Sequence, residues 1–94
     1  MKEKDIEAKI TKKAKDLGFL VYKFSSPSHR GVPDRIFISP EGGVFFIEFK
    51  SEKGKLTELQ NKVITDIRLQ GVEVFVVNNV KTGLEILDSK KGGF

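Results

Sequence analysis

The chain has 94 residues, of which 38% are hydrophobic and 32% are charged, and its formal net charge is +4. This composition excludes a disordered tail and a membrane-spanning protein, and it predicts one globular domain over residues 1–94 with no membrane partner. The sequence has no cysteine, which excludes disulfides and thiolate metal sites and suits a reducing, cytoplasmic setting. The charged N-terminus lacks the apolar segment of a secretory signal, and the excess of basic residues favours a polyanionic partner only weakly.

The first half of the chain predicts one helix and two strands. Apolar residues recur at helical spacing over residues 3–17, and Gly18 provides a C-terminal stop. An apolar strand is predicted over 19–24, followed by a loop over 25–33 that is rich in Ser, Pro and Gly. A second strand is predicted over 34–39.

The second half of the chain predicts the rest of a mixed sheet. The third strand follows a turn at 40–43 that is too short for a crossover, so it runs antiparallel to the second strand. A helix that begins near Thr57 acts as a right-handed crossover, so the strand after it is parallel to the third. The apolar face of this helix consists of Leu59, Val63, Ile64 and Ile67. The remaining elements are expected at 44–50 (strand), 57–71 (helix), 72–77 (strand) and 80–88 (helix), with a basic loop at 51–55 and a loose tail at 89–94. The fold class is therefore α/β, with a mixed four-stranded sheet flanked by helices.

The third strand carries Glu48 and Lys50 among apolar residues, and their spacing puts both side chains on one face of the sheet. An ion buried in a sheet costs several kcal/mol even after relaxation, so the two charges need an explanation. One explanation is a same-face ion pair at the end of a strand. The other involves Asp34, which follows Pro33 at the start of the neighbouring strand, although a strand that begins at a turn would explain Asp34 alone.

The length of the hairpin loop decides whether Asp34 shares a face with Glu48, because directly paired residues of an antiparallel hairpin share a face. A loop of all four residues 40–43 would pair Asp34 with Phe49 and put the two carboxylates on opposite faces. A loop over 40–42, with a glycine in the left-handed region, would pair Asp34 with Glu48. The two adjacent glycines favour the shorter loop, which predicts two carboxylates and one lysine on one patch of sheet.

Two carboxylates this close repel, and a divalent cation between them would remove the repulsion. Mg²⁺, or Mn²⁺ in its place, suits such a site because it needs only a couple of carboxylates, with water and substrate phosphate completing its octahedron. The predicted ligands are Asp34, Glu48 and the backbone carbonyl of Phe49. Lys50 would lie beside the attacking water and the scissile phosphate, where it could orient the water or stabilise charge on the phosphoryl oxygens.

Pro33-Asp34 and Glu48-Phe49-Lys50 have the pattern of the PD-(D/E)XK nuclease superfamily, on the second and third strands of a restriction-endonuclease-like αβββαβ core. More closely, the chain resembles the VRR-NUC family of virus-type replication-repair nucleases over nearly its whole length. The motif alone is short and degenerate, but "RGVPDR", "FIEFK" and a Gln at position 60 occur together in family-like order and spacing. The segments that carry the resemblance are "EKDIE" (3–7), "KFSSPSHRGVPDRI" (23–36), "FFIEFKSEKGKLTELQ" (45–60) and "GVEVFVV" (71–77).

The resemblance implies metal-dependent hydrolysis of DNA phosphodiester bonds, with Asp34 and Glu48 as metal ligands and Lys50 as the catalytic lysine. It also implies an accessory acid on the first helix. Kinship with Holliday junction resolvases implies a homodimer that acts on branched DNA in phage replication, recombination or repair, encoded by a phage or mobile element. No small-molecule cofactor is expected.

Two assignments remain open from the sequence. At 100° per residue, Glu3 lies near the centre of the apolar stripe of the first helix and Glu7 toward its edge, so Glu3 is the preferred accessory acid, unless it only complements the helix dipole. Thr57 and Gln60 match a capping box, in which the glutamine reaches back to the amide of residue 57. The resemblance instead directs Gln60 into the active site as a catalytic residue.

The loop ahead of Asp34 and the loop after the third strand carry hydroxyls and cations that suit phosphate contact. His29 could also act as a general base or ligand, and Arg35 is a less certain contact because it lies on the face opposite Asp34. Such contacts predict binding that weakens steeply with salt and has little sequence preference. The predicted DNA-binding residues are Lys23, Ser25, Ser26, His29, Arg30, Lys53 and Lys55.

The main alternative function is a non-catalytic nucleic-acid-binding module with a degenerate nuclease fold. The intact set of Asp34, Glu48 and Lys50 argues against it. A structural assembly subunit is a third possibility, but it would leave these three residues without a shared role.

Overall fold

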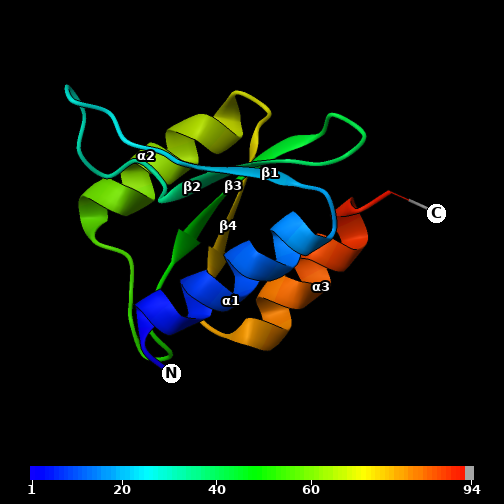
Figure 1. Ribbon diagram of the computed structural model, residues 1–94. Helices are drawn as coiled ribbons and strands as arrows, with labels where there is room; N and C mark the ends of the chain where they lie inside the picture. The colour runs from blue at the N-terminus through cyan, green and yellow to red at the C-terminus, as the bar shows by residue number, and fades with distance from the viewer. Residues whose placement is uncertain (93–94) are drawn as a thin grey trace.

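A computed structural model describes residues 1–92 and contains one four-stranded sheet, with α1 and α3 on one face and α2 on the other (Figure 1). The order of elements is the predicted one, and the predicted α/β class is confirmed. The elements are α1 (Glu3–Asp16), β1 (Leu20–Lys23), β2 (Arg35–Ile38), β3 (Val44–Phe49), α2 (Glu58–Leu69), β4 (Glu73–Val77) and α3 (Val80–Lys90). No helix within residues 1–92 combines the length and apolar character that crossing a membrane requires.

The last helix extends two residues beyond its predicted end at residue 88 and includes part of the predicted tail. Leu87 is fully buried, and Lys90 pairs with Glu73 on β4, so the final turn is attached to the sheet. The end of the predicted tail, residues 93–94, lies outside the described residues.

The strands lie in the order β1-β2-β3-β4. The β1–β2 and β2–β3 pairs are antiparallel, and the β3–β4 pair is parallel, as the intervening helix α2 requires. The predicted mixed sheet is therefore confirmed.

The β2–β3 hairpin has the shorter of the two loops considered from the sequence. Ser39 N donates to Gly43 O at 2.8 Å, so residues 40–42 form the loop, and Gly42 has a φ of +88°. The ladder pairs Arg35 with Ile47, and continuing it by one residue places Asp34 opposite Glu48. The prediction that the two carboxylates share a face of the sheet is confirmed.

The main core lies between the sheet and the α1–α3 pair. The register places Val21, Phe37 and Phe45 in one row, and the rings of Phe37 and Phe45 stack with centroids 5.2 Å apart. The fully buried Ile6 and Ile10 of α1 belong to the same hydrophobic cluster. This core fixes β2 and β3 relative to α1, and it therefore fixes the ends of the strands that carry the charged residues.

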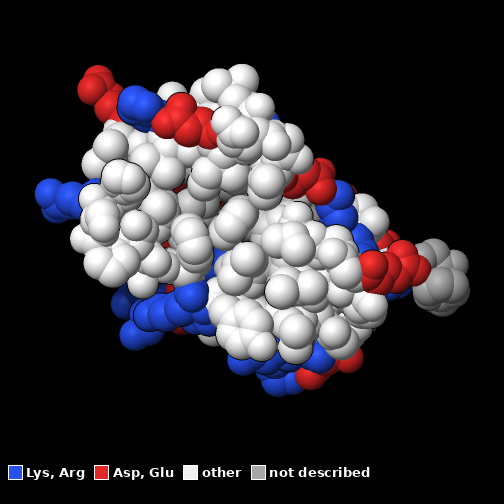
Figure 2. Space-filling view, turned by 90° about the horizontal axis from the view of Figure 1, so that it is seen from above, with Lys and Arg blue, Asp and Glu red and all other residues white. Residues whose placement is uncertain are grey.

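The opposite face of the sheet is only partly covered, because α2 packs against β4 and leaves the β1 side open. The register places Leu20, Ile38 and Val44 in one row on this face, and Leu20 and Val44 are 52% and 46% exposed. Tyr22 on the same face is 55% exposed. Figure 2 looks onto this side and shows few charged residues in its middle, with Lys, Arg, Asp and Glu gathered toward the rim.

The predicted apolar face of α2 is less buried than expected. Ile64 is fully buried, but Leu59 is 46% exposed, so the sheet does not cover the whole apolar face of this helix. Leu59 lies instead beside the loop that precedes β2, where a Cβ on Gly31 would come within 3.1 Å of its Cγ. Its apolar side chain therefore supports the loop rather than the sheet.

Candidate active site

Asp34 is fixed by backbone groups on both neighbouring strands. Its Oδ2 accepts a hydrogen bond from Phe49 N at 2.8 Å, and its own carbonyl accepts one from Phe24 N at 2.9 Å. Pro33 before it is fully buried. The Asp34 carboxylate is thereby held across the hairpin, next to the residue that follows Glu48.

Glu48 is almost completely buried, with 2% of its surface exposed. Lys50 Nζ lies 3.5 Å from Glu48 Oε2, and the Lys50 side chain is 13% exposed. Lys50 N donates to Val77 O at 2.9 Å, which continues the pairing of β3 with β4 past the end of β3. The same-face ion pair that the sequence suggested is present, but it lies in a buried site that also contains Asp34.

Gln60 connects α2 to both charged residues of β3. Its Nε2 donates to Glu48 Oε2 at 3.0 Å, and its Oε1 accepts from Lys50 Nζ at 2.8 Å. The same Oε1 accepts from Thr57 N at 3.0 Å, and Gln60 N donates to Thr57 Oγ1 at 3.1 Å, which completes a capping box. The Gln60 side chain therefore caps α2 and also contacts Glu48 and Lys50, and its catalytic role stays a prediction.

The carboxyl groups of the site are poorly stabilised in their charged forms. Burial, together with the nearby charge of Asp34, raises the pKa of Glu48 to about 7, and Lys50 offsets only part of this effect. Burial also raises the pKa of Asp34 above its ordinary value, against the lowering effect of the Phe49 N–H. Two neighbouring buried carboxyl groups with raised pKa values mark this cluster as a candidate functional site.

The residues present fit a divalent metal ion. Glu48 Oε1 is buried and has no hydrogen-bond partner within the described chain, so one carboxylate oxygen remains available as a ligand. No group of three or more His, Cys, Asp or Glu side chains within residues 1–92 is arranged to hold a metal. The candidate donors are thus the two carboxylates and the Phe49 carbonyl, a small set that suits Mg²⁺ because this ion retains water and takes substrate phosphate oxygens.

The two candidate accessory acids on α1 occupy different environments. Glu3 is exposed in the first turn, and its charge contributes to raising the pKa of Glu48. Glu7 is partly buried, accepts a hydrogen bond from Arg35 Nε at 2.8 Å, and contributes to raising the pKa of Asp34. The Glu7–Arg35 pair was missed from the sequence, although the alternation of β2 could have indicated it, because Arg35 faces α1 when Asp34 faces away.

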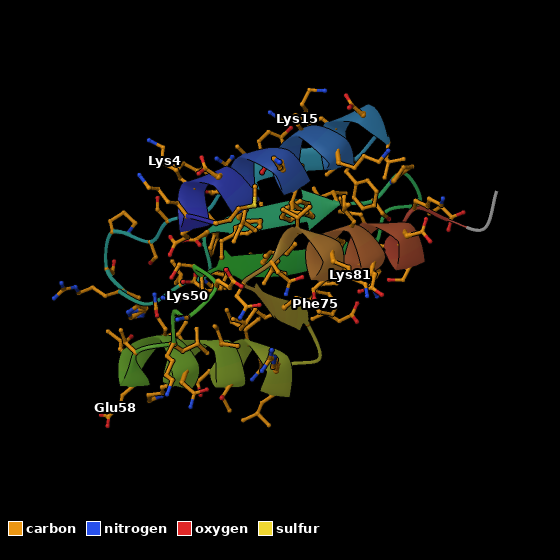
Figure 3. All side chains as sticks on the ribbon, turned by 90° about the horizontal axis from the view of Figure 1, so that it is seen from below. Lys4, Lys15, Lys50, Glu58, Phe75 and Lys81 are labelled. Atoms are coloured by element: carbon orange, nitrogen blue, oxygen red, sulfur yellow. The ribbon has the colours of Figure 1, made fainter. Side chains whose placement is uncertain are left out.

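The predicted DNA-binding residues lie at the end of β1 and in the loops before β2 and after β3, and within residues 1–92 none of them forms an ion pair with Asp34 or Glu48. Figure 3 shows Lys50 on the same side of the molecule as Lys4, at the start of α1. His29 and Arg30 line a shallow groove against α2 together with Lys62. The remaining predicted residues lie at the end of β1 or in the two loops, and all except the partly buried Ser26 are exposed: Lys23, Ser25, Ser26, Lys53 and Lys55.

Asp34 just before β2, Glu48 opposite it on β3 and Lys50 two residues further along, in an αβββαβ core, have the residue pattern and the fold of the PD-(D/E)XK nuclease class. The family model described as "VRR-NUC domain" matches residues 2–81. The chain belongs to the VRR-NUC family of nucleases.

Two known proteins are similar to the chain over most of its length. "Putative nuclease p44" of Acyrthosiphon pisum secondary endosymbiont phage 1 is 33% identical over 79 residues, which cover 84% of this chain and 85% of that protein. A solved structure described as "VRR_NUC domain" superimposes with a TM-score of 0.84 at 30% identity, covering 92% of this chain and 94% of that one.

The double role of Gln60 can be separated by substitution. Thr57→Ala removes the hydroxyl of the cap but leaves the Gln60 amide, so we expect a loss of about 1 kcal/mol in the free energy of unfolding with nuclease activity largely retained. Gln60→Ala keeps the bond from its own N–H to the Thr57 hydroxyl but removes the acceptor of Thr57 N and releases Lys50 and Glu48, so activity should fall by about 10–100-fold at a similar loss of stability. Urea unfolding and a cleavage assay on both variants measure the difference. Equal activity of the two variants would reduce Gln60 to a helix cap.

The raised pKa of Glu48 predicts a specific pH dependence of stability in the absence of metal. Between the ordinary value of 4.5 and the folded value of about 7, the folded protein holds a proton that the unfolded chain releases. Stability should therefore fall as pH rises through this window, by about 2 kcal/mol, and Glu48→Gln should lack this contribution. Urea unfolding of both proteins in EDTA from pH 5 to pH 8 measures it. Parallel curves for the two proteins would contradict the assignment.

Proposed function

We propose that the protein is a divalent-metal-dependent deoxyribonuclease that hydrolyses phosphodiester bonds as an endonuclease, with Mg²⁺ or Mn²⁺ as its cofactor. The observation that carries the proposal is the buried pair of Asp34 and Glu48, whose pKa values are raised and whose Glu48 Oε1 has no partner within residues 1–92. A lysine lies 3.5 Å from the same carboxylate. A structural ion pair would need neither the second carboxylate nor the free oxygen.

Each residue of the site has a distinct role in this proposal. Asp34, Glu48 and the Phe49 carbonyl hold the metal, with Glu3 as the preferred accessory acid and Glu7 as the alternative. When bound, the ion polarises the phosphoryl group and lowers the pKa of water at the site. Lys50 places an ammonium beside the reacting phosphate, where it stabilises developing negative charge.

Gln60 acts as a positioning residue in the same proposal. Its amide holds the Lys50 ammonium and the Glu48 carboxylate in one orientation, which limits the reorganisation needed during the reaction. Because the same side chain caps α2, the orientation depends on the first turn of that helix being formed.

The substrate we propose is DNA, held mainly through its phosphates. The net charge of +4 and the cations of the loops around the site support this choice. Hydroxyl and cationic side chains at Ser25, Ser26, His29 and Arg30 would contact backbone phosphates on one side of the site. Lys23, Lys53 and Lys55 would add further contacts, which makes the binding dependent on salt and largely independent of sequence.

We also propose that the nuclease is a homodimer that cuts branched DNA such as a Holliday junction, because symmetric incision of a junction needs two sites. The open apolar face around Leu20, Tyr22 and Val44 supports a second copy as the partner that covers it. The phage relative supports a cytoplasmic role in the replication, recombination or repair of phage or mobile-element DNA.

The alternative is a DNA-binding module without catalytic activity. In that case the two carboxylates and the lysine of this buried site would destabilise the fold and serve no catalytic purpose. The cleavage experiment below separates the two functions.

The catalytic assignment predicts metal-dependent cleavage that two single substitutions abolish. Supercoiled plasmid and a branched oligonucleotide should be cut in Mg²⁺ or Mn²⁺ and not in EDTA. Glu48→Gln removes a metal ligand and Lys50→Ala removes the ammonium, so each should lower the rate at least about 100-fold. The exposed Lys81→Ala on α3 is the matched control and should cut at the wild-type rate.

Circular dichroism should be the same for all four proteins, and DNA binding at low salt should be largely retained, because every variant keeps the loop residues that make most of the proposed phosphate contacts. Equal cutting by wild type and both variants would mean a contaminating nuclease. Binding without cutting by the wild type under every metal condition would favour the non-catalytic module.

The proposed dimer interface predicts that one substitution on the open face of the sheet lowers the mass in solution from that of a dimer to that of a monomer. The wild type should have about twice the 10.6 kDa mass of one chain in light scattering at micromolar concentration. Tyr22→Asp introduces a charge on the open face of the sheet and should give the monomer mass. Leu84→Asp, at a 38% exposed position on α3 across the sheet, should remain dimeric. A monomeric wild type, or dissociation by Leu84→Asp alone, would contradict the proposed interface.

A further inference from the structure

α1 carries a second cationic surface that the proposed DNA contacts do not include. A hollow of about 370 Å³ lies on the outer side of this helix, lined by Lys4, Thr11, Lys12, Lys15 and the Glu7–Arg35 pair. We define the α1 lysine track as Lys4, Thr11, Lys12 and Lys15. Figure 3 shows Lys4 and Lys15 along the edge of α1 that lies away from α3.

The charges of this hollow leave a surplus of cations. Its one acid, Glu7, is paired with Arg35 at 2.8 Å. Lys12 pairs with Asp16 at 3.2 Å in an exposed i,i+4 contact of small energy. Lys4 and Lys15 form no ion pair within residues 1–92. Two ammonium groups at the ends of the track are therefore available for an anionic ligand.

The floor of the hollow provides an independent observation. Thr11 is only 8% exposed, and its hydroxyl has no hydrogen-bond partner within the described residues. A helical threonine usually donates to a carbonyl one turn earlier or points into solvent. A buried hydroxyl without a partner within residues 1–92, beneath unpaired lysines, is a polar group of this hollow that a bound polar ligand would satisfy.

The dimensions of the track match a segment of DNA backbone. Lys4 and Lys15 are eleven residues apart, which is about 16 Å along a helix axis. One strand of a duplex carries a phosphate about every 3.4 Å along its axis, so the track spans about five base-pair steps. The Lys4 end of the track lies on the side of the molecule that carries Lys50. Arg35, which lines the same hollow as Lys4, directly follows Asp34 in the chain.

We propose that the α1 lysine track binds the sugar-phosphate backbone of DNA over about five base pairs on one side of the cut. The inference rests on the proposed function and extends it, because it adds a contact surface on α1 that lies outside the two loops around the site. Lysine ammonium groups act as point charges without reading bases, so the track positions the duplex and does not select its sequence.

The test compares two double variants of the same helix. Lys4→Gln/Lys15→Gln removes the two unpaired cations of the track, which lie within about 20° of each other at 100° per residue. Lys9→Gln/Lys13→Gln removes the same charge from the other side of α1, where Lys13 lines the groove against α3. Binding of a branched DNA with duplex arms is measured by fluorescence anisotropy in EDTA over a series of salt concentrations, so that no cleavage occurs.

The track variant should lower the slope of log K against log salt by about 2, because each lost phosphate contact removes about 0.9 from it. It should bind about tenfold more weakly at low salt, whereas the control variant should keep the wild-type slope. Equal slopes of log K against log salt for the two variants would contradict the proposal that the α1 lysine track binds the DNA backbone. Cleavage by the wild type in Mg²⁺ is measured separately. If the lysine track does not bind DNA, the wild type still cuts but the track variant keeps the wild-type slope. If the proposed function is wrong, the slope still falls but the wild type does not cut.

Discussion

The site depends on one constraint, the register of the β2–β3 hairpin. The loop at residues 40–42, with Gly42 in the left-handed region, puts Asp34 opposite Glu48. A shift of one residue would turn one carboxylate toward α1 and the other toward α2, because side chains alternate along a strand. The hydrogen bond from Phe49 N to Asp34 Oδ2 holds this register at the strand end that matters for chemistry. The apolar core on the other face supports the same register through the stacked rings of Phe37 and Phe45.

The register places two carboxylates close together in a buried site, and the neighbouring Lys50 and Gln60 only partly stabilise their charged forms. Burial and the nearby Asp34 raise the pKa of Glu48 to about 7 even with Lys50 at 3.5 Å. Gln60 satisfies one oxygen of Glu48 and leaves the other without a partner within residues 1–92. A site built only for stability would favour apolar residues here, so the remaining instability is consistent with a functional site that a cation completes.

The sequence could predict whatever followed from periodicity and loop chemistry. The shared face of Asp34 and Glu48 followed from strand alternation and from the adjacent glycines of the hairpin. The exposure of Leu59 could not be predicted, because helical periodicity identifies an apolar face without showing that a loop rather than the sheet packs against it. Strand alternation could have indicated that Arg35 faces α1, but its pairing with Glu7 in particular required knowing how α1 crosses the strands. Gln60 stayed ambiguous because capping and site contact both use the same amide, and only coordinates show that the two are compatible.

The most direct test of the metal site is anomalous diffraction from a crystal of the protein grown with Mn²⁺. We predict a strong anomalous peak between the Asp34 and Glu48 carboxylates, within coordination distance of Glu48 Oε1 and the Phe49 carbonyl. The same crystal form of Glu48→Gln should show no peak there. A wild-type map without a peak at this position, at a manganese concentration that supports cleavage, would contradict the claim that the paired carboxylates exist to hold a divalent ion.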